Sequence, residues 1–223
     1  MKDIKLLNLS AICQKMNTTP YRWKLVKNTF ASKEYAKNLL DTFPKEGFKR
    51  FQRDTGSKRH YFYGRCLIDN YVENASVHKV DSLSNIWNDL IHELLSDTYR
   101  KLMSKTSEIS LDGLRIEITC WRHLYGCFID PHPDKPEKVL THLFYFNQED
   151  WKSTDGGCLR ILRNSDIENY TDEILPLINT SVFFVRSDNS WHGTKPISIP
   201  NRARLALQVV FHKENMHYTT GYK

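Results

Sequence analysis

The stretch Ile129-Asp130-Pro131-His132-Pro133-Asp134 carries the most information in this sequence. His132 and Asp134 are two residues apart, and residues i and i+2 of an extended segment point to the same side. Their imidazole and carboxylate can therefore converge on one metal ion. A second imidazole is available from His192, in the later segment Asn189-Ser190-Trp191-His192-Gly193.

Two histidines and one carboxylate on one face of a metal ion leave its other positions open. This is the facial triad of non-haem iron(II) oxygenases. We therefore predict that His132, Asp134 and His192 are metal ligands. Arg202, ten residues after His192, begins the segment 202–207 and is a suitable partner for a carboxylate, because guanidinium binds carboxylates through two parallel hydrogen bonds.

The sequence around these residues has an apolar period of two, which is typical of strands. In the first such segment Leu114, Ile116, Ile118 and Cys120 alternate with polar residues. Further strand candidates are 139–146, 158–162, 180–185 and 204–211. Earlier in the chain the apolar spacing is helical, which predicts helices from Ser32 to Phe43 and from Ser82 to about Lys105. Helices followed by short strands predict a mainly β fold with flanking helices.

Length and composition favour one ordinary globular domain. The chain has 223 residues, of which 40% are hydrophobic and 26% charged. No apolar run approaches the roughly 18 residues of a membrane-spanning helix, and the N-terminus lacks the apolar core of a signal peptide. The five cysteines form no CxxC pair. This favours reduced thiols, and we expect a cytoplasmic protein without a membrane partner.

The positive charge lies in the first half of the chain. Residues 1–110 carry 19 Lys and Arg against 12 Asp and Glu, whereas residues 111–223 carry 13 against 14. Much of the excess is in the basic and aromatic stretch 45–65. Such a stretch can bind single-stranded nucleic acid, form a mobile lid that recruits an acidic small molecule, or be a solvated loop.

Several motifs together indicate a known family. The segments Leu140-Thr141-His142-Leu143-Phe144-Tyr145-Phe146-Asn147, Asp155-Gly156-Gly157-Cys158-Leu159-Arg160-Ile161 and Phe183-Phe184-Val185-Arg186-Ser187-Asp188 accompany the two histidine segments in the expected order. Residues 114–212 thereby resemble the core of the Fe(II)- and 2-oxoglutarate-dependent dioxygenases, in particular the prolyl 4-hydroxylase-like branch. The resemblance implies a double-stranded β-helix (jelly-roll or cupin-like) core at 111–215, buttressed by N-terminal helices and a substrate-lid region at 1–110, within a single domain spanning 1–223.

The resemblance also implies the cofactors and the reaction. The triad would hold Fe(II), and 2-oxoglutarate and dioxygen would be co-substrates, with release of succinate and CO2. Arg202 and the hydroxyl of Tyr145 would bind the distal carboxylate of 2-oxoglutarate, and Thr141 would line its pocket. Arg204 shares a strand face with Arg202, so either arginine can be the anchor, and for Arg204 a supporting or salt-bridge role is favoured.

The substrate is less well defined by the sequence. Trp121, Arg122 and Trp191 are candidates for its pocket, and the segment Trp121-Arg122-His123 departs from that of the hypoxia-factor prolyl hydroxylases. We expect hydroxylation of a small metabolite, such as an amino acid or a sugar-linked intermediate, with or without an acidic group. The alternatives are a peptidyl-prolyl hydroxylase and a non-catalytic sensor of iron or 2-oxoglutarate. AlkB-type demethylases carry a second arginine six residues after the anchor, where this chain has Gln208 or Val210. This argues against nucleic acid, and the sequence does not indicate the oligomeric state.

Overall fold

The computed structural model describes residues 5–55, 58–71 and 82–213. Its helices are α1 (Leu9–Ile12), α2 (Lys33–Asp41), α3 (Asn85–Leu94), α4 (Asp97–Ser107) and the 3-10 turn η2 (Ser153–Asp155). Its strands are β1 (Trp23–Lys27), β2 (Lys49–Thr55), β3 (Lys58–Tyr71), β4 (Arg115–His123), β5 (Ile129–His132), β6 (Lys138–Tyr145), β7 (Leu159–Leu162), β8 (Tyr170–Ile174), β9 (Thr180–Val185), β10 (His192–Thr194) and β11 (Arg204–His212).

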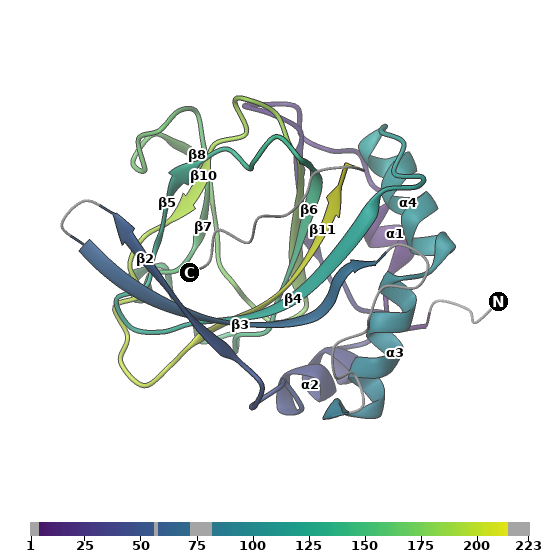
Figure 1. The fold of residues 1–223 in the computed structure, drawn as a ribbon, viewed down its shortest axis with the longest axis horizontal. Coiled ribbons are helices and arrows are strands. Elements are labelled where there is room, and N and C mark those ends of the chain that lie inside the picture. The colour runs from purple at the N-terminus through teal and green to yellow at the C-terminus, as the bar shows by residue number, and fades with distance from the viewer. Residues whose placement is uncertain (1–4, 56–57, 72–81, 214–223) are drawn as a thin grey trace.

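The strands form two antiparallel sheets that face each other. The larger sheet has the order β1-β9-β6-β11-β4-β3-β2, and the smaller has the order β5-β10-β7-β8. The helices lie against the outer face of the larger sheet (Figure 1). This arrangement confirms the predicted double-stranded β-helix core with N-terminal helices behind it.

Alternation along the central strands divides the apolar residues into two cores. On β6, Leu140 and Phe144 pack in the cluster between the larger sheet and the helices, whereas Leu143 and Tyr145 belong to the cluster between the two sheets. Strand β11 alternates in the same way, with Ala206 facing the smaller sheet. The period of two seen in the sequence therefore has a direct structural meaning, because it assigns one residue in two to the interior of the barrel.

One predicted element was wrong in its extent. The apolar repeat predicts a single helix from Ser82 to about Lys105, but the structure has two helices, α3 and α4, with Ser96 between them. The hydroxyl of Ser96 accepts a hydrogen bond from the backbone N–H of Tyr99 (3.1 Å) and donates one to the carbonyl of Glu93 (2.6 Å). Serine at this position therefore ends one helix and caps the next. The repeat continues across the break because both helices pack on the same sheet.

The basic and aromatic stretch forms strands. β2 and β3 pair as a hairpin, and β3 extends the larger sheet beside β4. The rings of Phe51 and Phe62 stack at 5.6 Å, and Phe62 also packs against Trp121. The rings of Phe51 and Phe62 therefore pack against each other and against Trp121 within the fold. The side chains of residues 53–61 lie outside the described part of the structure.

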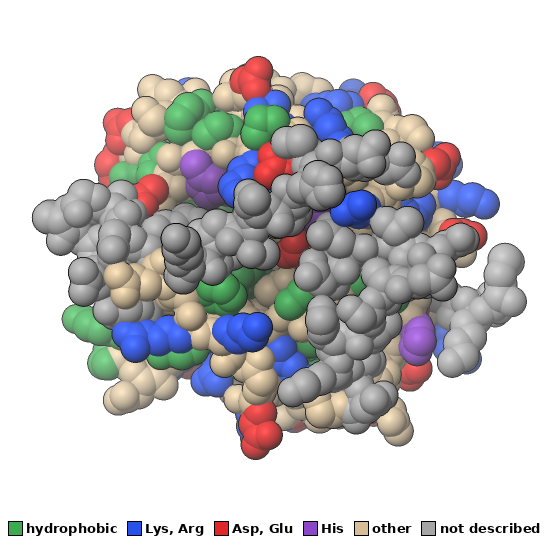
Figure 2. Space-filling view, in the orientation of Figure 1, with side chains coloured by type: hydrophobic (Ala, Val, Ile, Leu, Met, Phe, Trp, Pro, Cys, Tyr) green, Lys and Arg blue, Asp and Glu red, His purple; other side chains and the backbone are tan. Residues whose placement is uncertain are grey.

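Figure 2 shows small groups of basic and acidic side chains around the rim of this face, between apolar and other side chains. No helix in the described ranges is both long and apolar enough to cross a membrane.

His142 connects the helices to the larger sheet. It is fully buried, its Nδ1 lies 2.9 Å from the hydroxyl of Tyr99 on α4, and its Nε2 lies 2.9 Å from the hydroxyl of Ser181 on β9. Burial lowers the pKa of His142 to about 3. The imidazole is therefore neutral in the folded protein, whereas in the unfolded chain it titrates near its ordinary value of about 6.5.

This difference predicts an acid-sensitive fold. Between about pH 6.5 and pH 3 the unfolded chain binds a proton at His142 that the folded protein does not, so stability falls as the pH falls, by up to about 1.4 kcal/mol per pH unit from this residue. Urea unfolding at several pH values should show a shallower slope for His142→Gln than for the wild type. His92→Gln, at an exposed histidine of α3, should keep the wild-type slope. Equal slopes for the wild type and His142→Gln would contradict this account.

Candidate active site

Strand pairing brings two histidines together from distant parts of the sequence. His132 ends β5, His192 begins β10, and the two residues are direct partners in the antiparallel pairing of these strands. Their ring centroids lie 4.5 Å apart. Gly193 permits this approach, because a Cβ atom there would lie 2.8 Å from the carbonyl oxygen of Ile129.

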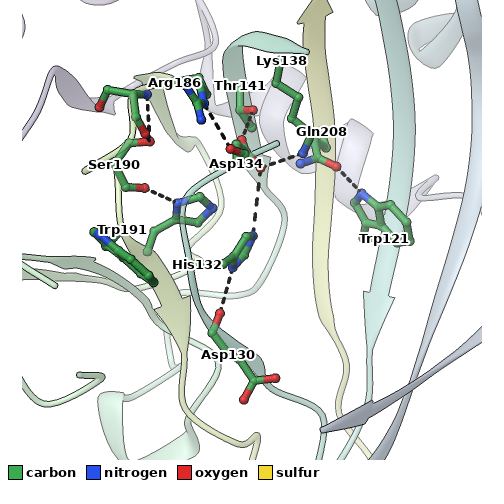
Figure 3. Close-up of polar contacts among 12 residues, drawn as sticks. Trp121, Asp130, His132, Asp134, Lys138, Thr141, Arg186, Ser190, Trp191 and Gln208 are labelled. Carbon is green, nitrogen blue, oxygen red and sulfur yellow. Dashed lines mark hydrogen bonds and ion pairs between the residues drawn. The ribbon is translucent and has the colours of Figure 1, made fainter. Parts of the chain in front are cut away.

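Each imidazole is oriented by a backbone carbonyl. Nδ1 of His132 donates to the carbonyl of Asp130 (2.8 Å; Figure 3), and Nδ1 of His192 donates to the carbonyl of Ser190 (2.9 Å). With the proton held on Nδ1, Nε2 keeps its lone pair. Such outer hydrogen bonds are typical of metal-ligating histidines.

Asp134 is buried at the turn between β5 and β6 and is surrounded by donors (Figure 3). Its Oδ2 accepts a hydrogen bond from the hydroxyl of Thr141 (2.7 Å), and its Oδ1 forms an ion pair with Lys138 Nζ (2.7 Å). Burial by itself would raise the pKa of Asp134, but Lys138, His192 and Thr141 together hold this pKa below its ordinary value. The carboxylate is therefore ionised.

The three side chains form a candidate metal site. Their potential ligand atoms all lie within 4.8 Å of one another, and Nε2 of His132 is 4.0 Å from Oδ1 of Asp134. Burial, and then the charge of His132, lower the pKa of His192 to about 4, so its imidazole is neutral near pH 7. Two imidazoles and one carboxylate are the donor set that suits non-haem Fe(II), so the residues present fit this metal.

A pocket extends from the triad into the space between the sheets. Aromatic and aliphatic side chains make up about half of its lining, and polar or charged side chains, the triad among them, make up the rest. Besides the triad, its lining residues are Phe62, Trp121, His123, Phe128, Ile129, Lys138, Leu143, Leu159, Phe184, Arg204, Ala206 and Gln208.

Arg204 is the buried cation of this pocket. It is 3% exposed, its Nη1 donates to Nδ1 of His123 (3.3 Å), and its guanidinium lies over the ring of Tyr145 (5.2 Å). Within the described ranges Arg204 has no ion pair with a carboxylate, and its buried Nε has no hydrogen-bond partner. Burial raises the pKa of Tyr145, so its hydroxyl, 3.5 Å from Nη2 of Arg204, stays protonated. Arg204 lines the pocket and suits an anionic ligand, whereas Tyr145 is fully buried beneath the guanidinium and is not among the lining residues.

Arg202 lies elsewhere, contrary to our expectation. Its Nη2 pairs with Asp150 Oδ1 at 2.8 Å and its guanidinium lies over the ring of Trp151, outside the pocket. The physical reason is that β11 begins only at Arg204. Arg202 is in the preceding turn, where strand alternation does not apply. The structure therefore places Arg204 where we expected Arg202.

The other predicted residues divide between the pocket and its surroundings. Trp121 lines the pocket, and its Nε1 donates to Oε1 of Gln208 (2.8 Å; Figure 3). Thr141 contacts Asp134 and is not among the lining residues. Arg122 lies over Phe48 at 5.5 Å and points away from the pocket, because it alternates with Trp121 on β4. Trp191 is also not among the lining residues.

Three polar residues of the pocket, His123, Lys138 and Gln208, were not predicted as site residues from the sequence. His123 is two residues after Trp121, so strand alternation could have placed both in the pocket. Lys138 is four residues after Asp134. No pattern in the sequence indicates that the chain turns between them and brings the ammonium back to the carboxylate.

The chain is similar to known oxygenases. Residues 117–212 match the family model of the 2OG-Fe(II) oxygenase superfamily. No curated protein matches the sequence. Among solved structures, a Pseudomonas putida prolyl-4-hydroxylase has a TM-score of 0.59 at 16% identity, with 92% of this chain and 97% of that chain covered.

Two further structures share the fold. An oxidoreductase of the 2OG-Fe(II) oxygenase family from Burkholderia pseudomallei has a TM-score of 0.65 at 11% identity, with 93% and 92% covered. A prolyl hydroxylase from Trichoplax adhaerens, in complex with a hypoxia inducible factor peptide fragment, has a TM-score of 0.61 at 18% identity, with 92% and 89% covered. At these identities the likeness concerns the fold.

The matched segment contains the three members of the triad, the pocket strands β6 and β11, and Arg204. The superfamily uses Fe(II), 2-oxoglutarate and dioxygen, and the donor set of the triad fits this metal. The segment that carries the site, residues 117–212, is therefore the part of the chain that matches the 2OG-Fe(II) oxygenase superfamily.

Proposed function

We propose that this chain is a hydroxylase that acts on a small metabolite, with 2-oxoglutarate as co-substrate. The observation that carries the co-substrate assignment is Arg204, a buried guanidinium in the triad's pocket without a carboxylate partner in the described ranges. Burying an uncompensated charge is costly, so an anionic ligand that pairs with Arg204 explains its presence.

Each residue then has a defined task. His132, Asp134 and His192 would hold Fe(II), and Arg204 and Tyr145 would hold the distal carboxylate of 2-oxoglutarate. Thr141 orients Asp134 through its hydrogen bond to Oδ2. Apolar side chains between the sheets, among them Leu143, Leu159 and Phe184, limit the access of water. When bound, the iron supplies the oxidising chemistry with dioxygen, and the protein supplies the geometry.

The size of the substrate is inferred from the walls of the pocket. Phe62 and Trp121 are in contact with each other and line one side, and Phe128 lines the pocket too. These bulky side chains favour a compact substrate. A peptidyl-prolyl hydroxylase is the second candidate, supported by the similarity in fold to prolyl hydroxylases. A non-catalytic sensor would bind the same ligands without turnover.

The first prediction concerns the metal. Fe(II) and 2-oxoglutarate, added together without oxygen, should give a weak visible charge-transfer band, because both bind at the triad. His192→Ala should remove the band or markedly weaken iron retention, since it deletes one of three ligands. His92→Gln, at an exposed histidine, serves as control. An unchanged band and unchanged iron affinity in His192→Ala would mean that the ligand is misassigned.

The second prediction concerns the anchor. Loss of a buried, charge-assisted pair costs about 2–5 kcal/mol, which corresponds to roughly thirtyfold to several thousandfold in affinity. Arg204→Leu should weaken 2-oxoglutarate binding in this range, as measured by calorimetry on the metal-loaded protein. Arg202→Leu should change this affinity little, because its guanidinium pairs with Asp150. The reverse order of the two variants would assign the anchor to Arg202.

The third prediction concerns the reaction. A metabolite screen scored by succinate release should identify a substrate whose product gains one oxygen atom from labelled dioxygen. Halogenases of this superfamily lack the carboxylate ligand of the metal, whereas this chain has Asp134 at that position. Moderate chloride should therefore not alter the product. Acceptance of a proline-containing peptide in place of metabolites would favour the second candidate. Binding of 2-oxoglutarate without succinate formation would favour the sensor.

A further inference from the structure

Gln208 is a neutral polar side chain in the wall of the pocket, and neither the triad nor the candidate anchor uses it. Gln208 and Arg204 lie on the same face of β11, and both line the pocket. Further along this face, Val210 is the register partner of Thr141, which binds Asp134. Gln208 therefore lies along the strand between the candidate anchor and the part of the sheet that holds the triad's carboxylate.

One contact fixes the orientation of the Gln208 amide. The indole N–H of Trp121 donates a hydrogen bond to Oε1 of Gln208 at 2.8 Å (Figure 3). An indole nitrogen can donate but cannot accept, so the oxygen of the amide, and not its NH2 group, must face Trp121. Trp121 is on β4, where it is the register partner of Ala206, and it reaches Gln208 diagonally. The amide oxygen is thereby held on the β4 side of β11, whereas Tyr145 lies on β6, on the other side.

The NH2 group of the same amide is not used by the protein. Within residues 5–55, 58–71 and 82–213, Nε2 of Gln208 has no hydrogen-bond partner. The side chain is half-buried and lines the pocket. Because Oε1 is occupied, Gln208 presents N–H donors and no acceptor to a ligand. A ligand that displaces water from these donors without replacing the hydrogen bond binds less tightly.

The donor borders an aromatic wall. The ring of Trp121 lies 5.6 Å from that of Phe62 and 6.2 Å from that of His123, and all three side chains line the pocket. A carbonyl group suits both features, because its oxygen accepts hydrogen bonds close to the plane of the group and its flat framework packs on aromatic rings. A group that can only donate, such as an ammonium, would face the NH2 group of Gln208 without an acceptor.

We infer that Gln208 is a specificity-determining residue, which donates a hydrogen bond from Nε2 to a carbonyl oxygen of the prime substrate. Trp121 is the positioning residue that holds the amide in its donor orientation. The prime substrate is then a metabolite that carries a carbonyl group. This inference rests on the proposed function, and it names the substrate class for the same site.

The test uses the protein loaded with Mn(II) and saturating 2-oxoglutarate, with small cyclic ketones as probes. Each ketone is paired with its carbonyl-free counterpart, for example tetrahydropyranone with tetrahydropyran, and relaxation of the probe protons by Mn(II) reports binding beside the triad. The wild type should bind at least one ketone about tenfold more tightly than its counterpart, as expected for one matched hydrogen bond. Gln208→Met, which is similar in size but has no N–H, should lose this preference and keep the wild-type affinity for 2-oxoglutarate.

Three further variants separate the orientation of the amide from its presence. Trp121→Phe keeps an aromatic ring but removes the indole N–H, so the amide is free to reverse and the preference for the ketone should fall. Gln208→Glu replaces the donor with an acceptor and should disfavour the ketone. Gln148→Met, at an exposed glutamine away from the pocket, should keep the wild-type preference.

The outcomes distinguish this inference from the proposed function. If the wild type prefers no ketone, or if the preference survives in Gln208→Met, the inference is overturned while the proposed function stands. A loss of 2-oxoglutarate affinity in Gln208→Met that matches the loss of ketone binding would assign the amide to the co-substrate and would also overturn it. If the wild type retains neither Mn(II) nor 2-oxoglutarate, the proposed function fails and the inference fails with it.

Discussion

The site depends on one strand pairing, that of His132 on β5 with His192 on β10. It places two imidazoles from distant parts of the sequence side by side, and Gly193 allows the strands to come this close. Asp134 follows directly after β5, so its carboxylate reaches the larger sheet, where Thr141 on β6 binds it. The candidate metal site therefore lies at the junction of the two sheets, and its geometry depends on how they pack.

The two buried charged groups of the pocket, the carboxylate of Asp134 and the guanidinium of Arg204, differ in their bonding partners. The carboxylate of Asp134 is satisfied by Lys138 and Thr141, which stabilise its ionised form. Within the described part of the chain, the guanidinium of Arg204 contacts His123 and Tyr145 and has no ion pair with a carboxylate. A buried cation of this kind costs stability in the absence of a ligand. Its retention in a pocket that also contains a metal-binding triad is the physical basis for assigning an anionic co-substrate there.

Much of the core could be predicted from the sequence, because alternation and short spacings survive folding. The period of two located β4, β6, β7, β9 and β11, and the HxD spacing with His192 predicted the three residues that the structure brings together. The errors occur where local patterns end. Arg202 was assigned by counting along a strand that begins two residues later, and Ser96 interrupts an apolar repeat that continues on both sides. Thr141 was placed on the correct face, but its partner is Asp134, and contacts of this kind depend on the turn between β5 and β6.

The most direct test of the account is a crystal structure of the protein with Mn(II) and 2-oxoglutarate. The account predicts that the metal ion is ligated by His132, Asp134 and His192, and that the distal carboxylate of 2-oxoglutarate contacts Arg204 and Tyr145. A metal ion bound away from these three side chains, or a 2-oxoglutarate carboxylate paired with Arg202 beside Asp150, would contradict it.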